Sequence, residues 1–203
     1  MVNNAGVAPE ASQPRPVWET RESVFDSTWT VNARGVFLGC KYAGAQMLRQ
    51  ERNPEYGRAG TIINMGSVLG VLGKPGTPAY AAAKGAVISM TRAVAMDYAP
   101  HAIHCNSILP GCECISTTDP AVKLHKIFVI LTLDRSDVRT PMIAAMTDDG
   151  DVAQHLADNH PLKRLVEAEE VADAAVFLAS SLSNGVTGLN MSVDGGLHSK
   201  VGL

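Results

Sequence analysis

Two side chains with complementary acid–base chemistry, Tyr80 and Lys84, lie four residues apart, a short way after Ser67. Residues four apart on a helix share a face, so the phenol and the ammonium would point the same way. A phenol normally loses its proton near pH 10, but a neighbouring ammonium stabilises the phenolate and lowers the pKa of the phenol. Tyr80 could then donate and accept a proton near neutral pH. The spacing therefore indicates proton transfer to or from a substrate.

The segments around these residues predict the elements that would position them. Residues 60–66 form an apolar run between two glycines, which is typical of a strand buried inside a parallel sheet, and Ser67 follows directly. Residues 79–99 are rich in alanine and lie between two prolines, which favours a helix that begins just before Tyr80. Ligands of such sheets bind at the carboxyl ends of the strands. We therefore expect the three side chains at that edge of the sheet.

Strand and helix patterns alternate along the rest of the sequence. Apolar residues recur at helical spacing over 22–49 and 167–182, and short β-rich runs occupy 102–109 and 188–193. The first residues, MVNNAGV, have the pattern of a short buried strand that ends in a tight turn. This alternation predicts an α/β fold, a Rossmann-like doubly wound parallel sheet with helices on both faces.

Composition and charge are those of one globular domain. The chain has 203 residues, of which 46% are hydrophobic, and carries a formal net charge of -3. Clustered basic residues and an apolar run of about 18 residues are both missing, so we expect no nucleic acid and no membrane as partner. No export signal is recognisable, and the four cysteines lack the spacing of a disulfide scaffold or a metal site. We therefore expect a cytoplasmic protein with free thiols and no metal ion.

Several short motifs in a fixed order give the chain a resemblance to the short-chain dehydrogenase/reductase family. In sequence order they are the turn Asn3, Asn4, Ala5 and Gly6; Asn32 in the following helix; Ser67, Tyr80 and Lys84; Pro110 and Gly111; and Asp194, Gly195 and Gly196. Each motif alone is common, whereas their order and spacing together are specific. The resemblance extends over nearly the whole chain apart from one segment.

The resemblance implies an oxidoreductase that uses NAD or NADP to interconvert an alcohol and a ketone. Tyr80 would exchange the proton with the substrate oxygen, Ser67 would hydrogen-bond that oxygen, and Lys84 would hold the nicotinamide ribose. Asn32 would hold a water that relays the proton. Cofactor contacts would come from Asn3, Asn4, Ala5, Gly6, Tyr80, Lys84, Pro110, Gly111 and Thr140. Other interpretations stay open, with Ser67 as a turn residue, Asn32 as a surface amide and Lys84 as a solvated charge.

The sequence departs from the family pattern at two places. In the family, three strand–helix units of roughly 80 residues in total precede the Asn-Asn-Ala-Gly turn and contain the glycine-rich turn for the pyrophosphate. We expect this chain, a single domain over 1–203, to be truncated by those units. Thr140 fits the family spacing after Gly111 only when residues 113–137 are removed. We interpret this block as an insertion, either a translated intron or a true loop.

These departures leave two functions open. The first is an NAD(P)-dependent oxidoreductase with an alcohol or ketone as its small-molecule substrate. The second is a catalytically inactive remnant of such an enzyme that acts through helix-mediated association. The resemblance implies a homo-dimer or homo-tetramer that forms through the helices at 22–49 and 79–99, and this association is compatible with either function.

Overall fold

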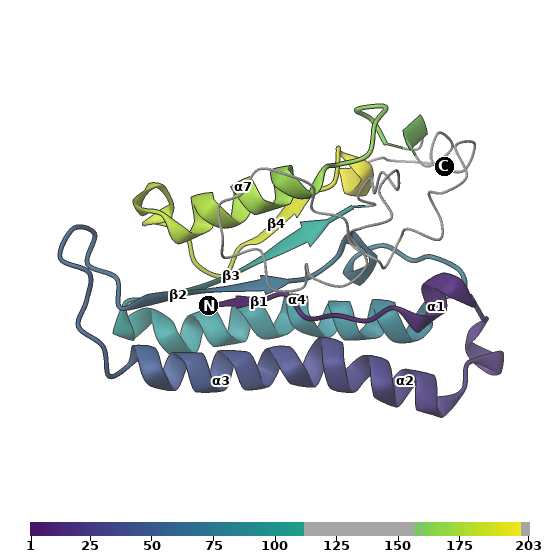
Figure 1. Ribbon diagram of the computed structural model, residues 1–203, viewed down its shortest axis with the longest axis horizontal. Helices are drawn as coiled ribbons and strands as arrows, with labels where there is room; N and C mark the ends of the chain where they lie inside the picture. The colour runs from purple at the N-terminus through teal and green to yellow at the C-terminus, as the bar shows by residue number, and fades with distance from the viewer. Residues whose placement is uncertain (112–156, 159, 200–203) are drawn as a thin grey trace, which may run out of the picture.

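The computed structural model describes residues 1–111, 157–158 and 160–199, and Figure 1 shows their arrangement. The strands are β1 (Val2–Asn3), β2 (Gly60–Met65), β3 (Ile103–Pro110) and β4 (Asn190–Val193). The helices are α1 (Pro9–Ser12), α2 (Glu22–Trp29), α3 (Gly35–Met47), α4 (Pro78–Tyr98) and α7 (Ala168–Ala179). Shorter helical turns are the π turn η2 (Thr30–Arg34) and the 3-10 turns η1 (Val17–Glu19), η3 (Val68–Gly70), η4 (Ala99–His101), η7 (Ser181–Ser183) and η8 (Leu197–Ser199).

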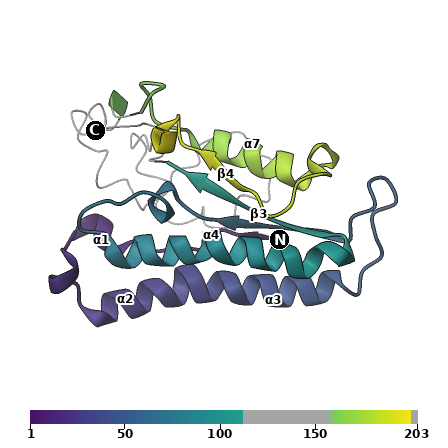
Figure 2. The same cartoon turned by 180° about the vertical axis from the view of Figure 1, so that it is seen from behind.

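The strands of the described part form one parallel sheet in the order β1-β2-β3-β4. Helices α3 and α4 cover one face of the sheet, with α2 on the same side beside α4, and α7 covers the other face, as Figures 1 and 2 show. The predicted parallel sheet with helices on both faces is confirmed. Because all strands run in the same direction, their carboxyl ends lie at one edge of the sheet, where Met65 and Pro110 end β2 and β3.

The predicted helices are present, with local differences. The helix expected at 22–49 consists of α2, the π turn η2 and α3 in succession. The π turn was not predicted, because the apolar residues on either side of it each keep helical spacing, and the shift between the two halves is not visible in that periodicity. The helix expected at 167–182 is shorter, since Glu167 is the N-cap of α7 and the chain continues into η7 after Ser180. Within residues 1–111 and 160–199, none of the helices is long and apolar enough to cross a bilayer.

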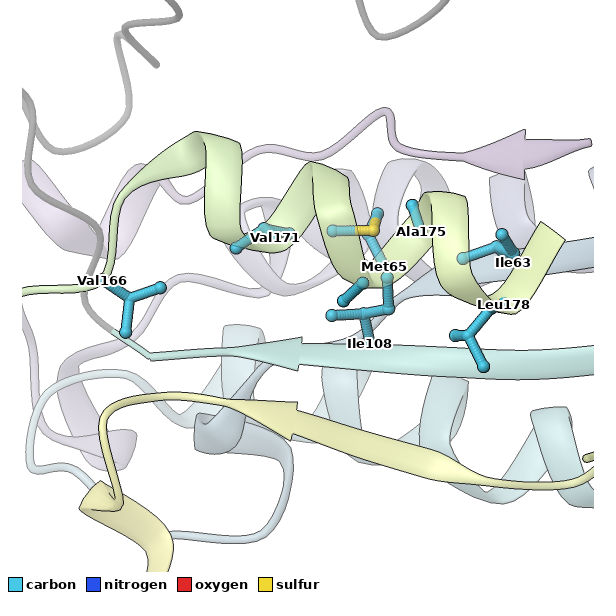
Figure 3. Close-up of a cluster of buried hydrophobic side chains, with 8 residues drawn as sticks. Ile63, Met65, Ile108, Val166, Val171, Ala175 and Leu178 are labelled. Carbon is cyan, nitrogen blue, oxygen red and sulfur yellow. The ribbon is translucent and has the colours of Figure 1, made fainter. Parts of the chain in front are cut away.

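Both faces of strand β2 are buried. On one face, Ile63 and Met65 pack against α7 in a cluster with Ile108, Val166, Val171, Ala174, Ala175 and Leu178 (Figure 3). On the other face, Ile62 packs in a cluster with Val36, Cys40, Val87, Ala95, Ile103 and Cys105. Successive residues of a strand point to opposite faces, so a strand between two helical layers must be apolar on both sides. The buried strand predicted at 60–66 is thereby confirmed.

The turn η3, which follows β2 and Ser67, lies directly on helix α4. A Cβ atom built at Gly70 would lie 2.8 Å from the carbonyl carbon of Lys84 and 2.9 Å from its oxygen. Real Cβ atoms do not approach other atoms so closely, so the two backbones meet at a position that only glycine can occupy without a shift. This contact fixes the turn after Ser67 against the helix that carries Lys84.

Replacing Gly70 by alanine is expected to lower the free energy of unfolding by about 1–3 kcal/mol, because the new methyl group must push η3 away from the Lys84 backbone. Gly73→Ala is the matched control, since no atom lies within 4 Å of a Cβ built at Gly73. Urea denaturation of both variants and of the unchanged chain measures the difference. Equal midpoints for the two variants would contradict the close contact at Gly70.

Candidate active site

Tyr80 and Lys84 lie on one face of α4, as their spacing predicted. Lys84 is 5% exposed, and its Nζ atom donates a hydrogen bond of 2.8 Å to the carbonyl oxygen of Met65, the last residue of β2. The same ammonium lies 5.6 Å from the centre of the Tyr80 ring. The interpretation of Lys84 as a solvated charge is therefore wrong. Helix α4 thus places the buried positive charge of Lys84 close to both the Tyr80 ring and the carboxyl end of β2.

Ser67 is buried in the turn that follows β2. Its Oγ atom accepts a hydrogen bond of 3.2 Å from the N–H of Leu69 and so caps η3. The interpretation of Ser67 as a turn residue is correct as far as this bond goes. The bond uses a lone pair of the oxygen, and a hydroxyl that accepts in this way can still donate its proton to another acceptor.

The side chain of Asn3 points into the protein core. Its Nδ2 atom donates a hydrogen bond of 2.8 Å to Oδ1 of Asn64, the residue that pairs with Asn3 in the register of β1 and β2. Asn64 is fully buried, and its own amide donates to Oγ1 of Thr91 in α4 over 3.0 Å. Asn3 thus ties the turn to β2 and α4. Asn64 was not predicted, although an amide in the middle of an apolar strand is a signal that could have identified it.

Two buried thiols extend this polar cluster. Oδ1 of Asn64 accepts from Cys40 and Nδ2 of Asn64 donates to Cys105, each at 3.5 Å. A hydrogen bond between the two thiols lowers the pKa of Cys40 and raises the pKa of Cys105. Both cysteines are free, as expected.

The rest of the Asn-Asn-Ala-Gly turn forms the rim of the sheet edge. Asn4 and Ala5 are exposed and Gly6 is half-buried. Asn32 in the π turn η2 holds the next residue, Val7, because its Oδ1 accepts from the Val7 N–H over 2.8 Å and its Nδ2 donates to the Val7 carbonyl over 2.7 Å. Asn32 is fully buried, so the interpretation as a surface amide is wrong.

Gly111 and Asp194, which belong to two of the predicted motifs, lie against each other. The N–H of Gly111 donates to the carbonyl of Val193 over 3.0 Å, and a Cβ built at Gly111 would lie 2.9 Å from Cβ of Asp194. Pro110 ends β3 immediately before this contact. The predicted cofactor residue Thr140 and the block at 113–137 lie outside the described residues.

A further buried residue at this edge, Glu10, was not predicted. Its carboxylate accepts hydrogen bonds from the N–H of Ala79 over 3.1 Å and from the N–H of Tyr80 over 2.8 Å. Glu10 and Tyr80 are separated by 70 positions, and no periodic pattern in the sequence relates them. The carboxylate therefore contacts the backbone of the residue whose phenol could carry the proton.

The site residues converge from separate elements on the carboxyl edge of the sheet. The turn after β1 contributes an exposed rim, the end of β2 contributes a hydroxyl, and α4 contributes a phenol beside a buried ammonium. A phenol, a hydroxyl and an ammonium at one edge can hydrogen-bond an oxygen atom whose charge changes during a reaction. The geometry is suited to proton exchange with an alcohol or a carbonyl compound.

Comparison with known proteins gives matches over most of the chain. Residues 1–123 match the family described as short chain dehydrogenase, and residues 134–198 match the family described as Enoyl-(Acyl carrier protein) reductase. The 2-(R)-hydroxypropyl-CoM dehydrogenase of Xanthobacter autotrophicus is 32% identical over 195 residues, which cover 96% of this chain and 65% of the relative. The inactive 2-(S)-hydroxypropyl-CoM dehydrogenase 2 of the same organism is 34% identical over 197 residues, which cover 97% of this chain and 72% of the relative.

Solved structures share the fold. The crystal structure of a gluconate 5-dehydrogenase from Burkholderia cenocepacia in complex with NADP and tartrate matches with a TM-score of 0.77 and 28% sequence identity, covering 98% of this chain and 64% of that chain. This chain thus spans about two thirds of the length of most of these relatives, 65% of the first. The match to the short chain dehydrogenase family over more than half of the residues includes the turn, Ser67, Tyr80 and Lys84. The chain belongs to the short-chain dehydrogenase/reductase family.

Proposed function

We propose that this chain carries the catalytic residues of an NAD(P)-dependent oxidoreductase that interconverts an alcohol and a ketone. The observation that carries this proposal is the buried Lys84 ammonium, which lies beside the Tyr80 ring and donates to the end of β2 close to Ser67. The names of the relatives support the reaction type, since they are dehydrogenases, and the NADP in a related crystal structure supports the cofactor.

In the direction of reduction, the Tyr80 hydroxyl gives its proton to the carbonyl oxygen of the substrate, and the product is the alcohol. NADH or NADPH, when bound, would supply the hydride to the carbonyl carbon. The Ser67 hydroxyl donates a hydrogen bond to the same oxygen while negative charge develops on it. The Lys84 ammonium favours the phenolate that Tyr80 becomes, and proton return to Tyr80 from solvent restores the site. Oxidation of the alcohol follows the same steps in reverse.

We propose that the described residues hold one end of a dinucleotide. Asn4, Ala5 and Gly6 stand at the accessible rim, and the proposal assigns them to the cofactor, as it does Pro110, Gly111 and Thr140. Lys84 would hold the nicotinamide ribose. In this proposal Asn3 acts from the core by shaping the turn. Asn32 would hold the relay water, and its side-chain amide binds Val7 through one hydrogen bond at each of its two polar atoms.

We propose that residues 1–203 form one domain that contains an insertion at 113–137. The match to one family model ends at residue 123, and the match to a second model begins at residue 134. Residues 124–133, in the middle of the block, are matched by neither model, which is compatible with an insertion there. Sequencing of the transcript across the block distinguishes a translated intron from a true loop.

We also propose a homo-oligomer that associates through the helices at 22–49 and 79–99. Large apolar side chains stay exposed on these helices in the single chain, namely Phe25, Trp29, Phe37 and Met96. Phe25 and Trp29 stack on α2 at 5.9 Å between ring centres and remain exposed together. A cytoplasmic location completes the proposal, and it is supported by the free thiols of Cys40 and Cys105, which are usual in a reducing compartment.

Cofactor binding is the first test. Titration of the chain with NADPH and with NADH, followed by nicotinamide fluorescence, is expected to saturate for at least one of them, and Lys84→Met is expected to weaken that binding about tenfold or more because a charged hydrogen-bond donor is lost. Lys41→Met is the matched control, since Lys41 also lies close to an aromatic ring, 5.7 Å from the centre of the adjacent Tyr42, but is exposed. An unchanged signal with both nucleotides would favour the inactive remnant.

Turnover is the second test. Tyr80→Phe is expected to lower kcat for ketone reduction by ~100-fold or more, because the general acid is removed while the ring stays in place. Tyr42→Phe removes the hydroxyl of an exposed tyrosine and is expected to leave kcat unchanged. The oxidation of the nicotinamide is followed by absorbance with a set of small ketones. Near-normal turnover by Tyr80→Phe would remove Tyr80 from the proposed role.

Association is the third test. Trp29→Glu and Phe37→Glu are expected to shift the sedimentation of the chain toward the monomer mass, because each places a charge on the apolar surface of the paired helices. Trp18→Glu is the control, since Trp18 is 81% exposed but lies in η1, outside both helices. A monomeric unchanged chain, or equal masses for all variants, would contradict the proposed interface.

A further inference from the structure

The segment 7–15 crosses the beginning of α4 and is fixed at three points. At its start, Asn32 binds both backbone groups of Val7. In its middle, Glu10 binds the first turn of α4. Near its end, the N–H of Arg15 donates to the carbonyl of Gly76 over 3.2 Å. The segment therefore connects the exposed rim at residues 4–6 to the helix that carries Tyr80.

Glu10 performs the task of a missing helix cap. The first N–H groups of an α-helix have no partner within the helix, and the residue before the helix usually supplies one. In the described part of the chain, the side chain of Thr77, the N-cap residue of α4, accepts no hydrogen bond from the helix N–H groups, and its hydroxyl donates to the carbonyl of Lys74 over 3.0 Å. Pro78 has no N–H, so the next two groups to be satisfied are those of Ala79 and Tyr80. Both donate to the Glu10 carboxylate.

The hydrogen bonds from the helix to Glu10 are of a strong kind. Glu10 is 2% exposed, and hydrogen bonds to an ionised group are shorter and stronger than those between neutral groups. A negative charge is also favourable at the N-terminal end of a helix, where the peptide dipoles leave a partial positive charge. The first turn of a helix frays unless it is held, and Tyr80 is the third residue of α4.

We infer that Glu10 is a positioning residue for Tyr80. Its carboxylate holds the backbone of Tyr80 in the first turn of α4, and thereby fixes the origin of the phenol relative to Ser67 and the rim. Lys84 lies one turn further into the helix and depends less on this cap. The consequence for catalysis rests on the function proposed above. The stabilisation of the first turn of α4 by Glu10 does not depend on that function.

Amide hydrogen exchange tests the hold directly. In Glu10→Ala, the exchange of the Ala79 and Tyr80 amides, measured by NMR, is expected to accelerate on the order of tenfold to a hundredfold, because two N–H groups lose a charged acceptor. Glu10→Gln keeps one oxygen acceptor and is expected to fall between Glu10→Ala and the unchanged chain. Glu10→Gln also provides the test if Glu10→Ala does not fold. Glu19→Gln is the matched control, since Glu19 is exposed in η1 and pairs with Arg15.

Kinetics test the positioning of the phenol. In Glu10→Gln, kcat for ketone reduction is expected to fall about tenfold or more, as misplacement of a reacting group does, while KM for the cofactor stays within about twofold. Unchanged exchange of the Ala79 and Tyr80 amides in both Glu10 variants would overturn the inference, as would an equal loss in kcat and cofactor affinity. Accelerated exchange in a chain that shows no turnover before mutation would support the hold of Glu10 and count against the proposed function.

Discussion

The hydrogen bond from the Lys84 ammonium to the Met65 carbonyl is the interaction on which the arrangement of the candidate site depends. A charge removed from water is costly unless it finds a partner, so helix α4 must place Lys84 where β2 ends. The close approach of Gly70 to the Lys84 backbone makes room for this placement. Ser67 lies between these two contacts in sequence, and Tyr80 lies one helical turn before Lys84. The buried cation thus contributes to the position of both, together with the Gly70 contact and the hydrogen bonds of Glu10 to the first turn of α4.

A second polar group, Asn64 in strand β2, connects the sheet to the same helix. It accepts a hydrogen bond from the side-chain amide of Asn3 in β1 and donates one to the hydroxyl of Thr91 in α4. Buried polar groups of this kind stabilise one register of the strands over others, because a shift by one residue would leave an amide without partners. The thiols of Cys40 and Cys105 complete its surroundings. Asn64 and Lys84 therefore attach α4 to β2 at two positions along the helix.

Much of the fold could be predicted from local pattern. The apolar run at 60–66, the alanine-rich segment at 79–99 and the spacing over 22–49 all correspond to the observed elements, since periodicity reports which side of an element is buried. The shared face of Tyr80 and Lys84 followed from helix geometry. Glu10 could not be predicted, because its partners in α4 are distant in sequence and are backbone groups, which every residue possesses. The burial of Asn32 escaped prediction because an amide within an amphipathic helix has the same pattern whether it faces solvent or a neighbouring loop.

The π turn Thr30–Arg34 has a consequence for the helix that contains it. Each residue of an α-helix advances the side-chain direction by about 100°, so one additional residue sets the two halves of a helix out of phase by that angle. With this offset, Thr28 is buried before the turn, Asn32 reaches Val7 within it, and Val36 and Cys40 meet the sheet after it. A straight helix of the same sequence would rotate one of these contacts toward water. The extra residue thus corrects the direction in which the side chains after it point. With one residue deleted from the π turn, the helix could not both bind the loop that follows the Asn-Asn-Ala-Gly turn and keep the packing of α3 on the sheet.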